Sequence, residues 1–243
     1  MSNYCLEKYN LTELKQMGNR MELPPRRSKS EMIKDISDAF NEYEQYKKLK
    51  IDRYSRHQQL GSKGKEGTTY LAIDNKHGKE YAMKTFRKTK SSATLYREYS
   101  LQKKASKKGV APKVYDYDTV GKWILMDRMD SHLIHDLNNI NLTKSEQERI
   151  IDIFKKLDEA KVLQGDSNIF NLMVKNGEIY LIDYGFAKEI TPELCKKLKT
   201  HHPNYHLMTI GFVIKLKELN ATEKSYKYLL KHISNEDKKK YGL

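Results

Sequence analysis

The sequence predicts an α+β fold with two lobes, the second reduced and mainly helical, preceded by a small helical module. Residues 57–129 alternate short runs of β-branched and aromatic residues with turn residues, a pattern typical of strands. Residues 133–243 and 4–41 show mainly helical spacing of apolar residues. The expected domains are a module with its linker at 1–45 and a two-lobed domain at 46–243, with lobes at about 56–129 and 130–243.

Composition limits the class of protein. The 243 residues suffice for one medium domain and an appendage. No run approaches the roughly 18–20 apolar residues that cross a bilayer, and Met1–Asn10 lacks the apolar stretch of a signal peptide. The two cysteines, Cys5 and Cys195, support neither a disulfide framework nor a zinc site. We therefore expect no membrane contact and an intracellular protein, cytoplasmic or nuclear.

The net charge of +14 is unevenly distributed. Residues 1–45 hold seven Lys/Arg and eight Asp/Glu, so the positive surplus lies in residues 46–243. Such a surplus attracts polyanions. A lysine-rich, solvated surface without a specific partner is the simpler explanation, and the sequence leaves both open.

The module is expected to contain two helices. One opens at Leu11–Lys15 with Thr12 as its N-cap, and the other opens at Ser28–Glu31. The second helix carries apolar residues at amphipathic spacing, namely Met32, Ile33, Ile36 and Phe40. The polar stretch from Asn41 to Arg56 is either an extension of this helix or a linker.

The first lobe is expected to be a sheet with one helix. Thr68–Ile73 and Lys79–Phe86 form a hairpin across the turn Asp74–Gly78. The remaining expected elements are a helix at about Ala93–Lys107, strands near Lys113–Tyr117 and Trp123–Met126, and, in the second lobe, a hairpin of Asn171–Val174 with Ile179–Asp183.

Two features of the first lobe suit phosphate binding. Gly61, Gly64 and Gly67 lead directly into a strand, and glycines let backbone N–H groups approach phosphate oxygens closely. Lys84 lies on the next strand, where it can pair with phosphates and be held by Glu98 on the following helix. Taken singly, the glycines are also explained by an ordinary turn between strands. Lys84 and Glu98 are each also explained as ordinary surface charges.

Two features of the second lobe suit proton transfer and metal binding. Asp166 can orient a hydroxyl or accept its proton, while the amide oxygen of Asn171 can ligate a hard cation. Asp183 supplies another oxygen ligand at a strand end and is followed by Gly185. An Asx turn and a strand-ending aspartate are the ordinary alternatives. Because independent accidents would have to place all four features in order, we favour a nucleotide site.

With these motifs the chain resembles the protein kinase superfamily over roughly residues 56–220. The resemblance implies that ATP, with Mg²⁺ or Mn²⁺, binds between the lobes. The implied site residues are the lid glycines Gly61, Gly64 and Gly67, the phosphate-binding Lys84 with Glu98, the gatekeeper Met126, the adenine hinge from Asp127 to Met129, the catalytic Asp166, and the metal ligands Asn171 and Asp183.

Several positions depart from the usual kinase pattern. Gln164-Gly165-Asp166 stands in place of His-Arg-Asp, and this form is similar to the RIO kinases, the KEOPS-complex kinase and aminoglycoside-type phosphotransferases. Without that arginine, control by loop phosphorylation is not expected. Lys63 looks like an insertion in the lid, and His206 stands in place of the aspartate usual in the buried helix of the second lobe. Thr191-Pro192-Glu193 is expected to start a helix as N-cap and first turn.

Residues 4–40 separately resemble a SAP motif, a two-helix module that often binds DNA. The matching residues are Leu11, Leu14, Leu23, Pro24, Ser28, Lys29, Met32 and Ile33. The basic turn Arg26–Lys29 could meet nucleic-acid phosphates at a helix start. A helical appendage packed on the lobes, without nucleic acid, is the alternative.

Together these features predict an ATP- and Mg²⁺-dependent phosphotransferase, with a serine/threonine protein kinase acting on a protein substrate as the favoured form. One alternative is a small-molecule or ribonucleoprotein-linked phosphotransferase or ATPase, favoured by the Gly165-Asp166 loop and the short second lobe. The other is a pseudokinase or nucleic-acid-binding scaffold, against which the presence of Lys84, Asp166 and Asp183 argues. The composition is compatible with a large DNA virus, in which case the virion is a further location. The sequence does not set the oligomeric state.

Overall fold

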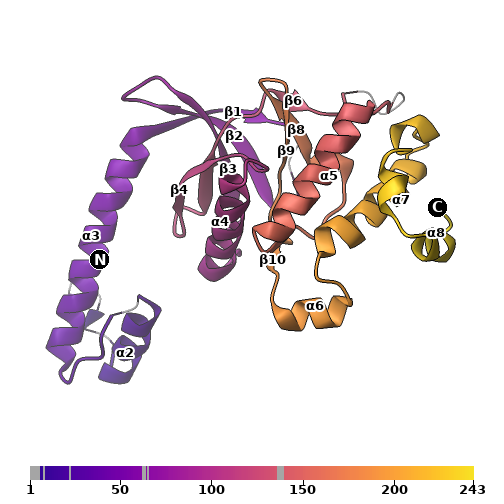
Figure 1. The fold of residues 1–243 in the computed structure, drawn as a ribbon. Coiled ribbons are helices and arrows are strands. Elements are labelled where there is room, and N and C mark those ends of the chain that lie inside the picture. The colour runs from indigo at the N-terminus through magenta and orange to yellow at the C-terminus, as the bar shows by residue number, and fades with distance from the viewer. Residues whose placement is uncertain (1–5, 8, 22, 62–63, 65, 136–139) are drawn as a thin grey trace. The chain divides into compact units, whose positions relative to one another are not determined.

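A computed structural model of the protein describes residues 6–7, 9–21, 23–61, 64, 66–135 and 140–243 (Figure 1). The chain divides into two compact units, residues 1–55 with 73–79 and residues 56–72 with 80–243. No helix in the described ranges combines the length and the apolar character needed to cross a membrane.

The first unit contains the helices α2 (Leu11–Arg20) and α3 (Lys29–Arg53). Asn10 caps α2, because its Oδ1 accepts the Glu13 N–H at 2.9 Å while the Glu13 carboxylate accepts the Asn10 N–H at 2.8 Å. The prediction of Thr12 as the N-cap is therefore wrong by two residues. The reciprocal Asn10–Glu13 bonds start the helix earlier.

An apolar cluster joins these two helices. Its buried members are Leu6, Leu14, Met32, Ile33 and Ile36. Met32 and Ile36 lie one turn apart on α3, as the amphipathic spacing predicted. The helix continues past the cluster to Arg53, so the polar stretch after Asn41 extends the helix as far as that residue.

The first lobe contains a five-stranded sheet in the order β1-β2-β3-β5-β4. The strands are β1 (Tyr54–Leu60), β2 (Gly67–Asp74), β3 (Glu80–Phe86), β4 (Val114–Asp118) and β5 (Trp123–Met126). β5 pairs antiparallel with β3 and β4, which sets Lys84 opposite Ile124. Strands β2 to β5 match the expected strands. β1 was not predicted, because its sequence is mostly polar and exposed and gives no alternation.

One helix, α4 (Ser92–Lys107), packs against this sheet (Figure 1). Ser91 Oγ caps it by accepting the Thr94 N–H at 3.1 Å. Leu95, Glu98 and Gln102 are all buried and recur at three- and four-residue spacing, so they share one face of the helix. α4 therefore carries a carboxylate into the interior of the lobe.

The second lobe is mainly helical and holds two small sheets. Its helices are α5 (Lys144–Glu159), α6 (Pro192–Leu198), α7 (Thr209–Glu218) and α8 (Asn235–Tyr241), with the short helical turns η1 (Ile169–Asn171), η2 (Asn204–Met208), η3 (Glu223–Ser225) and η4 (Leu229–His232). One sheet is β6 (Ser131–His132), β8 (Leu172–Lys175) and β9 (Glu178–Leu181), and the other is β7 (Val162–Leu163) with β10 (Lys188–Glu189). The expected hairpin is present as β8–β9, and Thr191 caps α6 as predicted.

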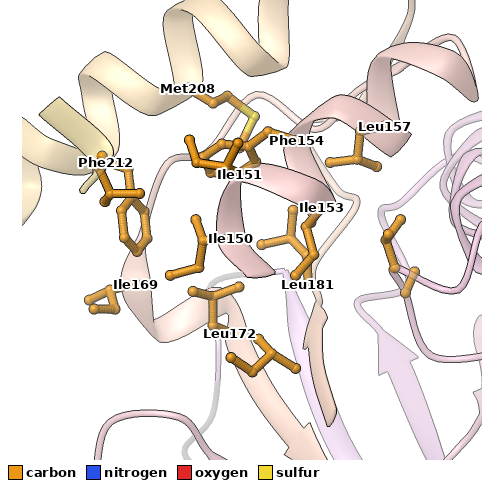
Figure 2. Close-up of a cluster of buried hydrophobic side chains, with 14 of the residues drawn as sticks. Ile150, Ile151, Ile153, Phe154, Leu157, Ile169, Leu172, Leu181, Met208 and Phe212 are labelled. Atoms are coloured by element: carbon orange, nitrogen blue, oxygen red, sulfur yellow. The ribbon is translucent and has the colours of Figure 1, made fainter. Parts of the chain in front are cut away.

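The core of this lobe surrounds α5 (Figure 2). The labelled α5 side chains are Ile150, Ile151, Ile153, Phe154 and Leu157, and they lie among Ile169, Leu172, Leu181, Met208 and Phe212. Burying an aliphatic or aromatic side chain of this size contributes about 1.5–3 kcal/mol. Because η1 and both strands of the hairpin supply part of this core, the packing fixes the segments that carry the candidate site.

Candidate active site

Lys84 lies in β3 with its side chain only 15% exposed, and it contacts two acids. Its Nζ donates to Glu98 Oε1 at 2.7 Å and to Asp183 Oδ1 at 2.8 Å. Burial lowers the pKa of Lys84, but the two carboxylates more than offset this effect, so the pKa lies above its usual value. The lysine is therefore charged at neutral pH and connects β3, α4 and the second lobe.

Asp183 follows β9 with a left-handed backbone, at φ 61°. Non-glycine residues seldom adopt this conformation, and strain of this kind concentrates at functional sites. Its carboxylate is half-exposed. Burial raises the pKa of Asp183, but the charge and hydrogen bond of Lys84 outweigh it and hold the pKa below its usual value. The Asp183 carboxylate is thus ionised and partly exposed, as a ligand for a metal ion needs to be.

Asp166 and Asn171 meet in the loop before β8. Asn171 Nδ2 donates to Asp166 Oδ2 at 2.9 Å, and the Asn171 carbonyl oxygen accepts the Ile182 N–H at 2.8 Å. The second bond ties the loop to the strand end that carries Asp183. The structure thus brings the predicted catalytic and metal-binding residues together in one region, and their roles remain predictions.

Gly165 explains why this loop lacks the usual arginine. Its backbone has φ 84°, and a Cβ at this position would lie 3.2 Å from the carbonyl oxygen of Phe186. A side chain here would be strained and crowded. The loop conformation therefore favours glycine directly before Asp166.

Gln164, the residue before Gly165, is fully buried. Its Nε2 donates to the carbonyl oxygens of Asp183 at 2.8 Å and Ile182 at 3.2 Å, and its Oε1 accepts the Asp166 N–H at 2.8 Å. One amide side chain, which can donate and accept at once, thus connects the two acidic segments. From the sequence, Gln164 stands out only as a departure from the family pattern.

Asn204, the first residue of η2, forms a hydrogen bond with Gln164. Its Oδ1 accepts the Gln164 N–H at 3.1 Å, and its Nδ2 donates to Asp158 Oδ1 at 2.7 Å. Burial raises the pKa of Asp158, although the N–H groups it accepts oppose the shift. The expectation for His206 is corrected here. His206 is partly exposed and contacts Asp237 at 3.0 Å, while Asn204, two residues earlier, contacts Gln164 in the loop that carries Asp166.

Of the expected lid glycines, Gly67 opens β2 and Gly61 directly follows β1. A Cβ on Gly67 would collide with the carbonyl oxygen of Thr85 on β3, so the close approach of the two strands requires glycine. The Gly64 N–H donates to the Gly67 carbonyl at 3.0 Å, and Gly61 is exposed. Lys63, the expected insertion, lies outside the described residues. Contact of these glycines with a nucleotide remains a prediction.

Asp127 and Met129 follow β5 at the expected hinge. The Asp127 carboxylate accepts the Tyr115 hydroxyl at 3.0 Å and Lys175 Nζ at 2.8 Å. Burial and the bond to Asp127 raise the pKa of Tyr115 to about 12. The Asp127 N–H donates to the Lys113 carbonyl, so a bond from Asp127 to adenine would have to use its own carbonyl oxygen. The roles of Asp127 and Met129 remain predictions.

Asn171 and Asp183 fit a hard divalent cation by chemistry. Both offer oxygen donors, which Mg²⁺ and Mn²⁺ prefer, and Asp183 is ionised. Asn171 Nδ2 faces Asp166, which leaves its Oδ1 as the donor for a metal. Within the described ranges, no three His, Cys, Asp or Glu residues gather to hold a metal by themselves.

Two charged residues that sequence reasoning missed also belong to this region. Lys90 Nζ lies 2.5 Å from Glu98 Oε2 and 2.8 Å from Glu66 Oε2. Lys90 occurs in a lysine-rich turn after β3, and its spacing gives no signal that separates it from Lys88. The contact forms only in the folded chain, which brings the turn after β3 close to Glu98 on α4.

Comparison with protein families identifies the domain. The model of the protein kinase domain matches residues 54–208, which is more than half of the chain and includes every candidate site residue. A search of curated proteins gave no match. The chain therefore belongs to the protein kinase domain family.

Proposed function

We propose that the protein is an ATP- and Mg²⁺-dependent phosphotransferase that phosphorylates serine or threonine residues of proteins. The observation that carries the proposal is the double contact of Lys84 Nζ, at 2.7 Å from Glu98 and 2.8 Å from Asp183. It brings a cation suited to phosphates and an oxygen ligand suited to a metal to the same place. Membership of the protein kinase family supports the same function.

Each site residue has a distinct part in this chemistry. Lys84 would bind the α- and β-phosphates while Glu98 holds it in place. Asn171 and Asp183 would hold Mg²⁺, which when bound neutralises phosphate charge. Asp166 would orient the acceptor hydroxyl. Its Oδ1 suits this role because Asn171 already donates to Oδ2.

The transfer exchanges one phosphorus–oxygen bond for another. The acceptor oxygen bonds to the γ-phosphorus as the bond to the β–γ bridging oxygen breaks, and ADP departs with that electron pair. The hydroxyl proton passes to Asp166. Because the transition state of such transfers is loose, positioning and charge supply most of the acceleration.

Transfer of labelled phosphate from ATP tests the proposal. With Mg²⁺, we expect label on serine or threonine of a basic protein, and no label after chelation of the metal or in the nearly isosteric variant Asp166→Asn. Wild-type turnover in Asp166→Asn would contradict the assignment of the catalytic residue. Absence of both transfer and Mg²⁺-dependent nucleotide binding in the wild type would contradict the enzyme and favour a pseudokinase scaffold.

A small-molecule or ribonucleoprotein-linked phosphotransferase is the second candidate. The observation that favours it is the backbone of Gly165, whose φ of 84° suits a Gly-Asp catalytic loop similar to that of the atypical kinases. The same assay separates the candidates. Label found only on small hydroxyl compounds would select this alternative over the protein kinase.

Nucleic-acid binding by the N-terminal helices has less support. In the basic turn, Arg26 Nε contacts Asp35 Oδ2 at 2.6 Å, and Lys29 Nζ donates to the Glu7 carbonyl at 2.7 Å. Phosphates would have to replace these internal partners. We retain the SAP-like role as a lesser proposal, which salt-dependent DNA binding by the full chain would support and its loss in Arg27→Ala would localise.

A further inference from the structure

Lys90 lies at the centre of a charge network, and none of the roles proposed above for the site residues involves it. Its side chain is only 8% exposed, although lysine is among the residues least often buried. Nζ reaches Glu98 Oε2 at 2.5 Å and Glu66 Oε2 at 2.8 Å. A lysine buried to this degree between two carboxylates has a fixed position.

Both oxygens of the Glu98 carboxylate are engaged by lysines. Lys84 contacts Oε1, Lys90 contacts Oε2, and Glu98 itself is 2% exposed. Holding both oxygens fixes the plane of the carboxylate as well as its position. Loss of Lys90 would leave one carboxylate oxygen buried without its cation, which is costly enough to shift the side chain.

The ring of Phe86 strengthens this arrangement. Lys84 Nζ lies 5.3 Å and Lys90 Nζ 4.2 Å from the centre of the ring. Both distances allow attraction between an ammonium group and the face of an aromatic ring. The two lysines thus share an acid and an aromatic support.

The second partner of Lys90 belongs to the lid. Glu66 directly precedes Gly67, and its carbonyl oxygen accepts the Arg87 N–H at 3.2 Å. Its Oε2 lies where a Cβ on Gly185 would be 2.7 Å away, so this carboxylate reaches the segment after Asp183. Lys90 therefore connects α4, the base of the lid and the vicinity of the predicted metal ligand.

We propose that Lys90 is a positioning residue for phosphoryl transfer, acting through Glu98 on Lys84 and through Glu66 on Gly67, where the glycine-rich segment enters β2. The inference rests on the proposed function, since it assigns a residue to that same site. Lys90 does not need to touch the nucleotide in this role. It sets the direction in which Lys84 presents its ammonium group and the position of Glu66 and Gly67 at the start of β2.

A set of variants of the full chain tests this role, with Lys88→Met as the matched control. Lys88 lies two residues earlier in the same turn and is exposed. We expect Lys90→Met to lower kcat/KM on the order of tenfold to a hundredfold, as for other residues that orient a ligating group. Lys90→Arg should recover most of the loss because it keeps the charge, and Lys88→Met should match the wild type.

A double-variant cycle with Glu98→Gln identifies the route of the effect. If Lys90 acts on Lys84 through Glu98, Lys90→Met should cause in the Glu98→Gln background only the several-fold loss that belongs to its contact with Glu66. Full additivity of the two losses would overturn that route. Wild-type kcat/KM in Lys90→Met would overturn the proposal while leaving the enzyme assignment intact. A wild type that neither binds Mg²⁺-ATP nor transfers phosphate would instead overturn the proposed function, and this inference with it.

Glu66→Gln tests the lid arm and also provides a variant that keeps both lysines and Glu98. We expect its KM for ATP to rise several-fold while kcat stays near the wild-type value, because the contacts among Lys84, Glu98 and Lys90 remain and only those of Glu66 change. An unchanged KM would overturn the lid arm. Thermal unfolding of each variant with and without Mg²⁺-ADP separates loss of positioning from loss of folded protein.

Discussion

Gln164 Nε2 donates to the carbonyl oxygen of Asp183 at 2.8 Å, which joins the loop that carries Asp166 to the strand end that carries the predicted metal ligand. The Oε1 of the same side chain accepts the Asp166 N–H. Gln164 is fully buried, so water does not compete for either bond. One amide side chain thus connects Asp166, which would orient the acceptor hydroxyl, with Asp183, which would bind the metal.

Replacement of Gln164 by leucine should reduce both stability and turnover. We expect the loss of these buried bonds to lower the free energy of unfolding by about 1–3 kcal/mol. Turnover of the folded fraction should fall by about tenfold or more, because Asp166 and Asp183 lose their common support. Urea unfolding and steady-state kinetics at matched folded concentration measure the two effects.

Gln147 provides the matched control. It is equally a buried glutamine, and its amide contacts the carbonyl oxygens of Leu142 and Lys224, away from the site. Gln147→Leu should lose similar stability and retain the turnover of its folded fraction. An equal loss of turnover in both variants would mean that Gln164 acts only through stability.

Asp183→Asn should abolish Mg²⁺-dependent transfer. The amide keeps the shape but removes the charge that Lys84 contacts and that the metal requires. Measured against metal concentration, activity should not recover at any Mg²⁺ level that supports the wild type. A shift in metal requirement with full recovery would show that Asp183 is a dispensable ligand.

The contact between Lys84 and Asp183 also predicts how stability depends on pH. The folded state holds the pKa of Asp183 below its unfolded value of about 4, so this group contributes stability above that pH. The contribution is lost as pH falls through the lower, folded pKa. Lys84 has a raised pKa, so its contribution is complete below its unfolded value of about 10.4 and declines only at higher pH.

Melting temperatures of the wild type and Asp183→Asn test this pH dependence. Their difference should be constant between about pH 6 and 9 and should shrink as pH falls below about 4. A difference that stays the same down to pH 3 would mean that the carboxylate gains no stability from Lys84 in the folded state.

Local patterns in the sequence were sufficient for most of the first lobe. Strand alternation and the turn at Asp74–Gly78 predicted β2 and β3, and helical spacing predicted α4, because these signals act between near neighbours. The spacing of Lys84 and Asp183, 99 residues apart, carries no such signal. Only the resemblance to kinases suggested that these two residues would meet.

Contacts formed by the folded chain explain what sequence reasoning missed. Lys90 is one lysine among many until the turn brings it over Glu98. Asn204 was passed over because family spacing pointed to His206, whereas the five-residue π turn at η2 places Asn204 inward. Such shifts of register have no counterpart in composition or periodicity.

The assignment of Asn204 in place of His206 can be tested directly. Asn204→Ala should lower stability by about 1–3 kcal/mol, because the buried Asp158 carboxylate loses its side-chain donor, keeping only the backbone N–H groups of residues 204 and 205, and the Gln164 N–H loses its acceptor. Turnover should fall as well, since Gln164 positions both acids. His206→Ala removes only a partly exposed contact with Asp237 and should change stability by less than about 1 kcal/mol, with normal turnover. Loss of turnover in His206→Ala with normal turnover in Asn204→Ala would mean that His206, and not Asn204, positions the loop that carries Asp166.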